Sequence, residues 1–458
     1  MDADFKRDRA GALGKLLQGP KHPDQEFVRS GASFGQVYAM AARLRMALSG
    51  PEYQGRAVCL AAEDKAIVAA ALLAALSGGP SLLLPYAFSA KALHRMQQAT
   101  GFSTAISDVP RDFPAGVQVF CPQLEEKEVK PAFSAAGPPL ADTELLKIFT
   151  GGTTGAPQVW LKTCWNIFGE GFFLARRFAV TEKDCILATI PAYHIYGLLF
   201  SVVLPLVASA TVIGDTPSFP MEIARAAKEQ QASLLASVPA HYRVLREMQL
   251  GAPLRLAFSS AGMLDAEDNR GFHDPNGVGI VEVYGSTETG GIATRNRFFG
   301  EEAFHPFATV DWKIAEGRLA VRSPYISPDL VVDDAGYFTS GDRAEARGES
   351  KFILKGRGDT VTKVGGKRVD LAEIRSLINN QPGVADCAVM ALPEAGGREH
   401  QIGVLIQGPK VDMETIRKVL AEALEPYALP RRMKKVELIP VKKNGKYDWL
   451  RIGRMLQQ

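Results

Sequence analysis

The stretch Phe149–Gln158, "FTGGTTGAPQ", follows the apolar run "LLKIF" and contains three glycines and three threonines. Glycine-rich turns leave backbone N–H groups free to point inward, and such a nest binds phosphate oxygens. The hydroxyls of Thr150, Thr153 and Thr154 add donors and can reach a metal ion. The segment therefore predicts a phosphate-binding loop after a buried strand.

Two alternatives stay open at this point. A P-loop nucleotidase needs the pattern G-x-x-x-x-G-K-[ST]. Gly151 to Ala156 provide no Gly-Lys-Thr, and Lys162 comes too late in the chain. An ordinary loop without a ligand is the other alternative.

Length and composition set the frame for this loop. The chain has 458 residues, 46% of them hydrophobic and 22% charged, which favours two or three globular domains. The net charge of +3 gives no support to a nucleic-acid partner. Residues 361–458 hold 17 Lys and Arg against 11 Asp and Glu. This basic segment could attract an acidic partner or a phosphorylated cofactor, or simply face water.

The chain shows no targeting signal in its sequence. The five cysteines are scattered without a CxxC pair, as expected for free thiols in a reducing compartment. The N-terminus has no apolar h-region, and the apolar runs are too short or too broken to cross a membrane. We therefore expect a cytoplasmic protein without a membrane span.

Helical and strand-like patterns alternate through the first 300 residues, which favours an α/β fold with largely parallel sheets. "DKAIVAAALLAALSGGPSLLLPY" predicts a helix, a Gly-Gly stop and a buried strand. After about residue 300, short alternating runs predict an antiparallel, β-barrel-like piece. The end of the chain predicts a small α+β domain. We expect a large domain over residues 1–357 and a small, mobile domain over 360–458.

The loop resembles the phosphate loop of the acyl-adenylate-forming (AMP-binding) enzymes, the superfamily of acyl- and aryl-CoA synthetases, adenylation domains and luciferases. Their pattern is T-[SG]-G-[ST]-T-G-x-P-K-G, and this chain departs from it with Gln158 for Lys and Val159 for Gly. The resemblance implies that the loop holds the β- and γ-phosphates of ATP. The loop residues concerned are Thr150, Gly151, Gly152, Thr153, Thr154 and Gly155.

"EVYGSTETGG", Glu282–Gly291, resembles the Y-G-x-T-E motif of the same family. The resemblance implies that Tyr284 stacks on adenine and that Thr287 contacts the α-phosphate. It also implies that Glu288, together with Thr153, helps to hold Mg²⁺, an ion that prefers oxygen ligands. Gly285 and Ser286 would complete this nucleotide-binding turn.

Three further segments follow in the order of the family. "GYFTSGDRAE" is similar to G-W-F-x-T-G-D, so Asp342 would accept hydrogen bonds from the ribose hydroxyls. In "LKGRGDTVTKVGGKRVD", Arg357 would reach the ribose or phosphate, Asp359 would be the hinge, and Gly365–Gly366 would admit a thiol-bearing arm. In "PVKKNGKYDWL", Lys446 would place a mobile ammonium where negative charge builds up during adenylation.

The family order also suggests which residues line the acid and thiol pocket. His194 in "IPAYHIYGLLF" follows the P-x-x-H-x-x-G position with Gly197, although a core or capping histidine remains an alternative. The segments "SVPAHYRVL" and "FSSAGML" match those that wall the acid and adenine sites. They contribute Val238, Ser260, Ala261 and Gly262.

The resemblance implies an ATP-dependent acid–thiol ligase. A small carboxylic acid, fatty or aromatic, would become acyl-AMP with release of pyrophosphate, and the acyl group would pass to CoA or to the phosphopantetheine of an acyl carrier protein. A weaker resemblance to short bacterial ligases found beside fatty-acid and polyene synthases favours the carrier protein. The alternative is a nucleotide-binding homologue with weak or lost activity, motivated by Gln158 and Val159. A P-loop ATPase is a third hypothesis, which the absent Gly-Lys-[ST] disfavours.

Overall fold

The structure is a computed structural model that describes residues 8–124, 141–150, 158–357, 361–364, 367–393, 400–424, 426–442 and 445–458. The chain forms two compact units. The N-terminal unit comprises Met1–Asp311 and Arg322–Asp333, and the C-terminal unit comprises Trp312–Val321 and Asp334–Gln458. The strands after Asp311 are thus grouped with the C-terminal residues. The predicted hinge Asp359 lies outside the described residues, so the predicted boundary stays a prediction.

The first layer of the N-terminal unit is a six-stranded sheet in the order β4-β3-β1-β2-β5-β6. All neighbours pair in parallel except β5 and β6, which are antiparallel. Its elements are α2 (Arg9–Leu17), α3 (Phe34–Ala47), η1 (Pro51–Tyr53), β1 (Val58–Ala61), α4 (Lys65–Leu76), β2 (Leu82–Leu84), α5 (Ala90–Thr100), β3 (Thr104–Ser107), β4 (Gln118–Phe120), β5 (Glu144–Thr150) and β6 (Gln158–Thr163).

The second layer is a seven-stranded sheet in the order β13-β12-β11-β10-β9-β7-β8. The strands from β11 to β8 are parallel, and β12 and β13 are antiparallel additions. Its elements are η2 (Trp165–Gly169), α6 (Glu170–Arg177), β7 (Cys185–Ala188), α7 (Ile195–Leu198), η3 (Leu199–Val203), α8 (Leu204–Ala208), β8 (Thr211–Val212), α9 (Pro220–Glu229), β9 (Leu234–Ser237), α10 (Pro239–Val244), β10 (Leu256–Ser259), α11 (Ala266–Asn276), β11 (Ile280–Ser286), β12 (Gly290–Arg295), η4 (Arg297–Phe299) and β13 (His305–Pro306).

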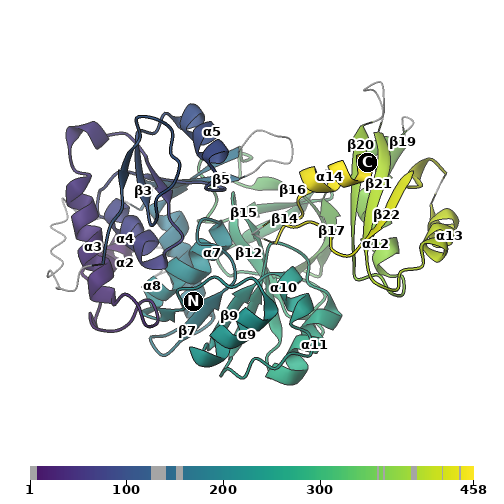
Figure 1. Cartoon of the computed structure of the whole chain (residues 1–458), viewed down its shortest axis with the longest axis horizontal. Coiled ribbons are helices and arrows are strands. Elements are labelled where there is room, and N and C mark those ends of the chain that lie inside the picture. The colour runs from purple at the N-terminus through teal and green to yellow at the C-terminus, as the bar shows by residue number, and fades with distance from the viewer. Residues whose placement is uncertain are drawn as a thin grey trace. The chain divides into compact units, whose positions relative to one another are not determined.

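Local sequence explains these elements. Asp64 caps α4 by accepting hydrogen bonds from the N–H groups of Ala66 and Ile67, and the helix that follows is apolar and buried on all sides. Helix α3 packs along α4 (Figure 1). Helices α9, α10 and α11 lie together against the second sheet, where one apolar cluster joins them to β7, β9 and β10 (Figure 1). The predicted helix–strand alternation is confirmed.

The C-terminal unit begins with a four-stranded sheet, which is the antiparallel piece expected after residue 300. A hairpin and an α+β part follow. The elements of this unit are β14 (Asp311–Ala315), β15 (Arg318–Arg322), β16 (Phe338–Arg347), β17 (Lys351–Arg357), β18 (Val361–Val364), β19 (Lys367–Asp370), α12 (Leu371–Asn379), β20 (Asp386–Pro393), β21 (His400–Gln407), α13 (Met413–Ala423), η6 (Pro426–Ala428), β22 (Arg432–Val436) and α14 (Trp449–Gln457).

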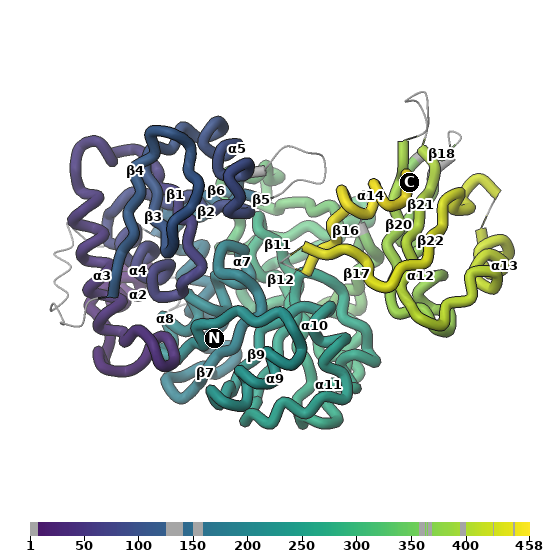
Figure 2. The backbone as a smooth tube through the Cα atoms, viewed as in Figure 1, coloured from purple at the N-terminus to yellow at the C-terminus, as the bar shows by residue number. Residues whose placement is uncertain are grey.

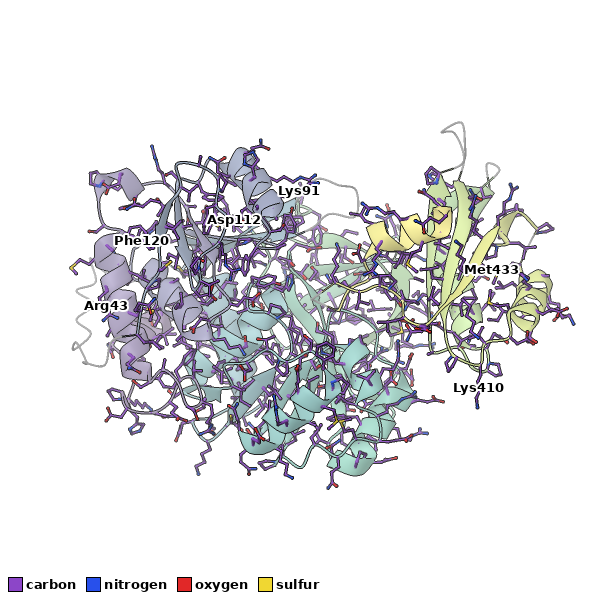
Figure 3. All side chains as sticks on the ribbon, in the orientation of Figure 1. Arg43, Lys91, Asp112, Phe120, Lys410 and Met433 are labelled. Carbon is purple, nitrogen blue, oxygen red and sulfur yellow. The ribbon has the colours of Figure 1, made fainter. Side chains whose placement is uncertain are left out.

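Figure 2 shows β20, β21 and β22 side by side with α14 beside them. Alternation along β20 fills two cores. Cys387 and Val389 pack with α12 and α13, whereas Ala388 and Leu392 pack with α14. Met433 on β22 lies within this unit, and Lys410 extends from its edge (Figure 3). The predicted small α+β domain is confirmed.

The cysteines and the lengths of the helices complete the description of the fold. All five cysteines are free, and only Cys121 is exposed. Among the helices of the described ranges, none has the length and apolar character that crossing a bilayer demands.

Candidate active site

Both motif-bearing loops join antiparallel strands that end a parallel sheet. Thr150 at the end of β5 pairs with Gln158 at the start of β6, so the ends of the predicted phosphate loop are hydrogen-bonded. Gly151, Gly152, Thr153, Thr154 and Gly155 lie outside the described residues, as does the side chain of Thr150. The placement of these loop residues around a phosphate therefore stays a prediction.

The second motif forms the turn between β11 and β12. The hydroxyls of Ser286 and Thr289 lie 2.8 Å apart, and the Ser286 N–H donates to Thr289 Oγ1 at 3.2 Å. These bonds close a tight turn with Thr287 and Glu288 at its centre, both half-buried. The structure thus presents the two predicted catalytic side chains of the motif from one rigid turn.

Glycine is required on both sides of this turn. Gly290 has φ +70°, and a Cβ there would lie 2.5 Å from Glu170 Oε2. A Cβ on Gly285 would lie 2.3 Å from the Gly290 carbonyl oxygen. The turn is therefore packed directly on the carboxylate of Glu170.

Two buried charged side chains, those of Lys162 and Glu170, form hydrogen bonds to the backbone of the turn. The sequence patterns did not predict this role for either residue. Lys162 Nζ donates to the carbonyls of Glu288 at 3.1 Å and Tyr325 at 2.9 Å. Glu170 Oε1 accepts the Gly291 N–H at 2.7 Å. Burial lowers the pKa of Lys162 and raises that of Glu170, and the attraction between the two charges opposes both shifts.

Tyr284 is supported by a second buried charge pair. Glu282 on β11 receives two hydrogen bonds from Arg295 on β12, at 2.8 and 2.9 Å, and the two side chains are 4% and 5% exposed. The guanidinium of Arg295 stacks over the Phe304 ring at 4.3 Å. The Phe304 ring in turn lies 5.5 Å from that of Tyr284. The buried Glu282–Arg295 pair thus contacts Phe304, and Phe304 contacts the Tyr284 ring that is expected to stack on adenine.

The predicted pocket residues follow neighbouring parallel strands, so they meet at one edge of the second sheet. Ser237 at the end of β9 pairs with Ser259 at the end of β10. The residues that follow them, Val238 and Ser260, therefore leave the two strands at the same level of the sheet. Ala261 has φ +70°, a region that residues other than glycine rarely adopt. A Cβ on Gly262 would meet Pro239 at 3.5 Å. Ser260, Ala261 and Gly262 therefore form a constrained loop against Pro239, the residue after Val238.

His194 is the N-cap residue that precedes α7 at the same edge, and its ring lies 4.5 Å from that of Tyr193. A Cβ on Gly197 would lie 2.1 Å from the Pro191 carbonyl, so only glycine fits there. Another histidine was missed by the motif search. His241 on α10 bonds through Nδ1 to Thr189 Oγ1 at 2.8 Å, and burial lowers its pKa to about 4. His241 is therefore a neutral, hydrogen-bonded imidazole.

Six of the predicted site residues belong to the C-terminal unit: Asp342, Arg357, Asp359, Gly365, Gly366 and Lys446. Asp342 on β16 is the strand partner of Arg357 on β17, whose side chain lies outside the description, and the Asp342 N–H donates to Ser340 Oγ at 3.1 Å. The hinge residue Asp359 and the pair Gly365–Gly366 also lie outside the described residues. Their roles stay predictions.

Lys446 is exposed and sits in a tight turn. The Lys442 N–H donates to the Lys446 carbonyl at 2.7 Å. The next residue, Tyr447, is anchored because its hydroxyl donates to Asp386 at 2.7 Å and accepts from Arg375 at 2.6 Å. Hydrogen bonds therefore hold the backbone at and beside Lys446, which is itself an exposed residue.

The described part of the chain has no cluster of three or more His, Cys, Asp or Glu side chains that could enclose a metal ion. A single half-buried carboxylate on a fixed turn, that of Glu288, fits Mg²⁺ in another way. Magnesium keeps several waters and binds one or two protein carboxylates together with substrate phosphates. The donor set is thus compatible with Mg²⁺ carried in with a nucleotide.

Comparison with known families gives two matches. The sequence profile of the AMP-binding enzyme family matches residues 17–327, and that of the AMP-binding enzyme C-terminal domain matches residues 373–446. Among curated relatives, a sulfoacetate–CoA ligase of Cupriavidus necator is 25% identical over 70% of this chain and 69% of its own length. A 4-coumarate–CoA ligase of Halorhodospira halophila is 28% identical over 61% of this chain and 67% of its own.

Solved structures with the same fold include an ATP-bound MatB from Rhodopseudomonas palustris, with a TM-score of 0.78 at 20% identity. It covers 97% of this chain and 98% of its own. The O-succinylbenzoate CoA synthetase of Bacillus subtilis in complex with AMP has a TM-score of 0.78 at 18% identity, over 98% of both chains. At these identities the likeness concerns the fold, and it confirms the predicted α/β architecture with a small C-terminal domain.

Proposed function

Because the chain belongs to the AMP-binding enzyme family, we propose that it is an acyl-adenylate-forming ligase that joins a small carboxylic acid to the thiol of CoA. The predicted family, fold class and enzyme class are confirmed. The observation that carries the proposal is the β11–β12 turn, where Tyr284, Thr287 and Glu288 project from a backbone held by buried charges. ATP and CoA are the co-substrates that this family and its ligase relatives use.

In the first step, an oxygen of the acid's carboxylate attacks the α-phosphorus of ATP, and pyrophosphate leaves. Tyr284 would hold the adenine, Thr287 the α-phosphate, and Asp342 the ribose. Lys446 would neutralise the negative charge that develops at the α-phosphate. Mg²⁺ held by Glu288 and Thr153 would neutralise charge on the phosphates.

In the second step, the thiol sulfur attacks the acyl carbon, its proton is lost, and AMP leaves with the C–O bond electrons. Exchange of Lys446 for the Gly365–Gly366 segment, by rotation about Asp359, is the proposed route by which the thiol gains access. CoA is the favoured acceptor because the relatives named above are CoA ligases. The phosphopantetheine of an acyl carrier protein is the alternative acceptor, and the basic residues 361–458 suit the phosphates of either.

Acid-dependent exchange of labelled pyrophosphate into ATP tests the proposal. The panel should contain benzoates, cinnamates and fatty acids, with malonate and sulfoacetate added because relatives act on them. Exchange with one class, followed by thioester formation with CoA, is the expected result. If the protein bound ATP but catalysed no pyrophosphate exchange with any acid of the panel, a nucleotide-binding homologue without ligase activity would be favoured. The departures Gln158 and Val159 in the phosphate loop would then account for the loss of activity.

A further inference from the structure

Two buried charged residues of the N-terminal unit have no role in the proposed reaction as described so far. Lys162 lies near the end of β6, the strand that leaves the phosphate loop, and its side chain is 1% exposed. Glu170 begins α6 and is 3% exposed. Reciprocal hydrogen bonds between Thr163 and Asn166, at 3.0 and 3.2 Å, close the corner that joins these two elements.

Both side chains act on the same short piece of backbone. Lys162 holds the carbonyl of Glu288, which also accepts the Ser327 N–H at 2.8 Å. Glu170 holds the N–H of Gly291. The backbone of the turn is therefore hydrogen-bonded to the Lys162 ammonium at Glu288 and to the Glu170 carboxylate at Gly291. The side chains of Thr287 and Glu288 belong to the same turn.

A buried charge is costly unless other groups compensate it. Lys162 interacts electrostatically with Glu170, Glu288 and Asp329, and Glu170 interacts with Lys162. An apolar pair would fill the same space at lower cost but would bind neither the Glu288 carbonyl nor the Gly291 N–H. The arrangement therefore favours precise placement of the turn over the stability of the core.

We propose that Lys162 and Glu170 are positioning residues that fix Thr287 and Glu288 in the geometry needed for adenylation and tie this turn to the strand leaving the phosphate loop. The consequence for catalysis rests on the proposed function. The consequence for the backbone of the turn does not.

The test uses the full-length protein with Lys162→Met, Glu170→Met and the double variant, because methionine offers no acceptor for the Gly291 N–H. Lys65→Met is a matched control. Lys65 is also 1% exposed, and its Nζ also donates to two backbone carbonyls, those of Ile213 and Asp215. Both lysine variants remove a buried cation and its hydrogen bonds to two backbone carbonyls, but only Lys162→Met removes a bond to the turn, that to Glu288.

Amide hydrogen exchange, followed by mass spectrometry of peptides covering residues 282–295, is the first readout and needs neither ATP nor acid. Because a displaced reacting group can cost about 100-fold in rate, we expect the kcat of acid-dependent exchange to fall about 10- to 100-fold in Lys162→Met and in Glu170→Met. The KM for the acid should stay within about two-fold, since the acid pocket is built by other strands. The kcat of the double variant should be no lower than that of the less active single variant, because the effects of residues that act together are not additive.

The peptides of the turn should exchange faster in Lys162→Met and as in the wild type in Lys65→Met, at temperatures where both remain folded. Equal protection of the turn in all variants would overturn the proposal. So would equal losses of kcat in Lys162→Met and Lys65→Met, since the effect would then be one of general stability. If the wild-type protein showed no acid-dependent exchange, the proposed function would fail, while the hydrogen-exchange comparison would still decide the positioning role.

Discussion

Removing Arg295 tests how firmly the nucleotide-binding turn is supported. The Arg295 guanidinium is 5% exposed and makes two hydrogen bonds to Glu282, which is 4% exposed. In Arg295→Met the carboxylate would stay buried. Among the described residues, it would keep a 3.3 Å hydrogen bond from the Leu264 N–H and a 3.5 Å approach of Arg297. Breaking one partner of a buried pair costs about 3–5 kcal/mol.

For a unit of this size that loss lowers Tm by about 4–8 °C, because the unfolding entropy scales with chain length. Scanning calorimetry of the wild type, Arg295→Met and the double variant Glu282→Met/Arg295→Met measures it. The double variant should recover at least about half of the loss, since two apolar side chains of similar volume often replace a buried pair without cost.

The same change reaches the adenine site. Arg295 stacks on Phe304, whose ring lies against Tyr284. Loss of this cation–π contact should weaken AMP binding by about two- to five-fold, measured by calorimetric titration. A variant Arg295→Met that melts with the wild type, or a double variant no more stable than the single one, would refute the reasoning about the buried pair.

Three further variants test separate parts of the site. Lys446→Ala should lower the rate of adenylation by about 100-fold or more while sparing thioester formation from supplied acyl-AMP; survival of both half-reactions would remove Lys446 from the mechanism. Asp342→Ala should raise the KM for ATP by about ten-fold, and an unchanged KM would exclude the ribose contact. His241 has a pKa of about 4 in the folded protein against about 6.5 unfolded, so its contribution to stability is complete above pH 6.5 and is lost as pH falls towards 4. Urea unfolding of wild type and His241→Gln should show a shallower decline in the variant over this range, and parallel declines would contradict the buried neutral imidazole.

The resemblance to the Y-G-x-T-E motif located this turn in the sequence, and the structure shows that its residues also carry a local signal. The run Ser286–Thr289 has hydroxyls at the spacing that closes a turn, and flanking glycines mark the close approach of another group. The pattern of apolar residues in "DKAIVAAALLAALSGGPSLLLPY" predicted α4 and β2 for the same reason, since periodicity is a local property.

The supports of the turn could not be predicted in this way. As a P-loop phosphate ligand, Lys162 comes too late in the chain after the glycines. Its partner carbonyl, that of Glu288, lies 126 positions further on. Only the isolated Lys within the apolar "VWLKT" hinted at a buried cation. Likewise, no local sequence pattern predicts the hydrogen bond between His241 and Thr189, because these residues follow different strands of the parallel sheet, β9 and β7.

The packing of the turn on Glu170 also bears on how proteins of this fold can be recombined. The turn and its two supports occupy separate stretches of the gene, with Lys162 and Glu170 on one side and Glu288–Gly291 on the other. A crossover anywhere between residues 170 and 282 would combine the turn of one parent with the residues at positions 162 and 170 of another parent. Chimeras built for new acid specificity should therefore inherit these positions from a single parent, or exchange them as a set.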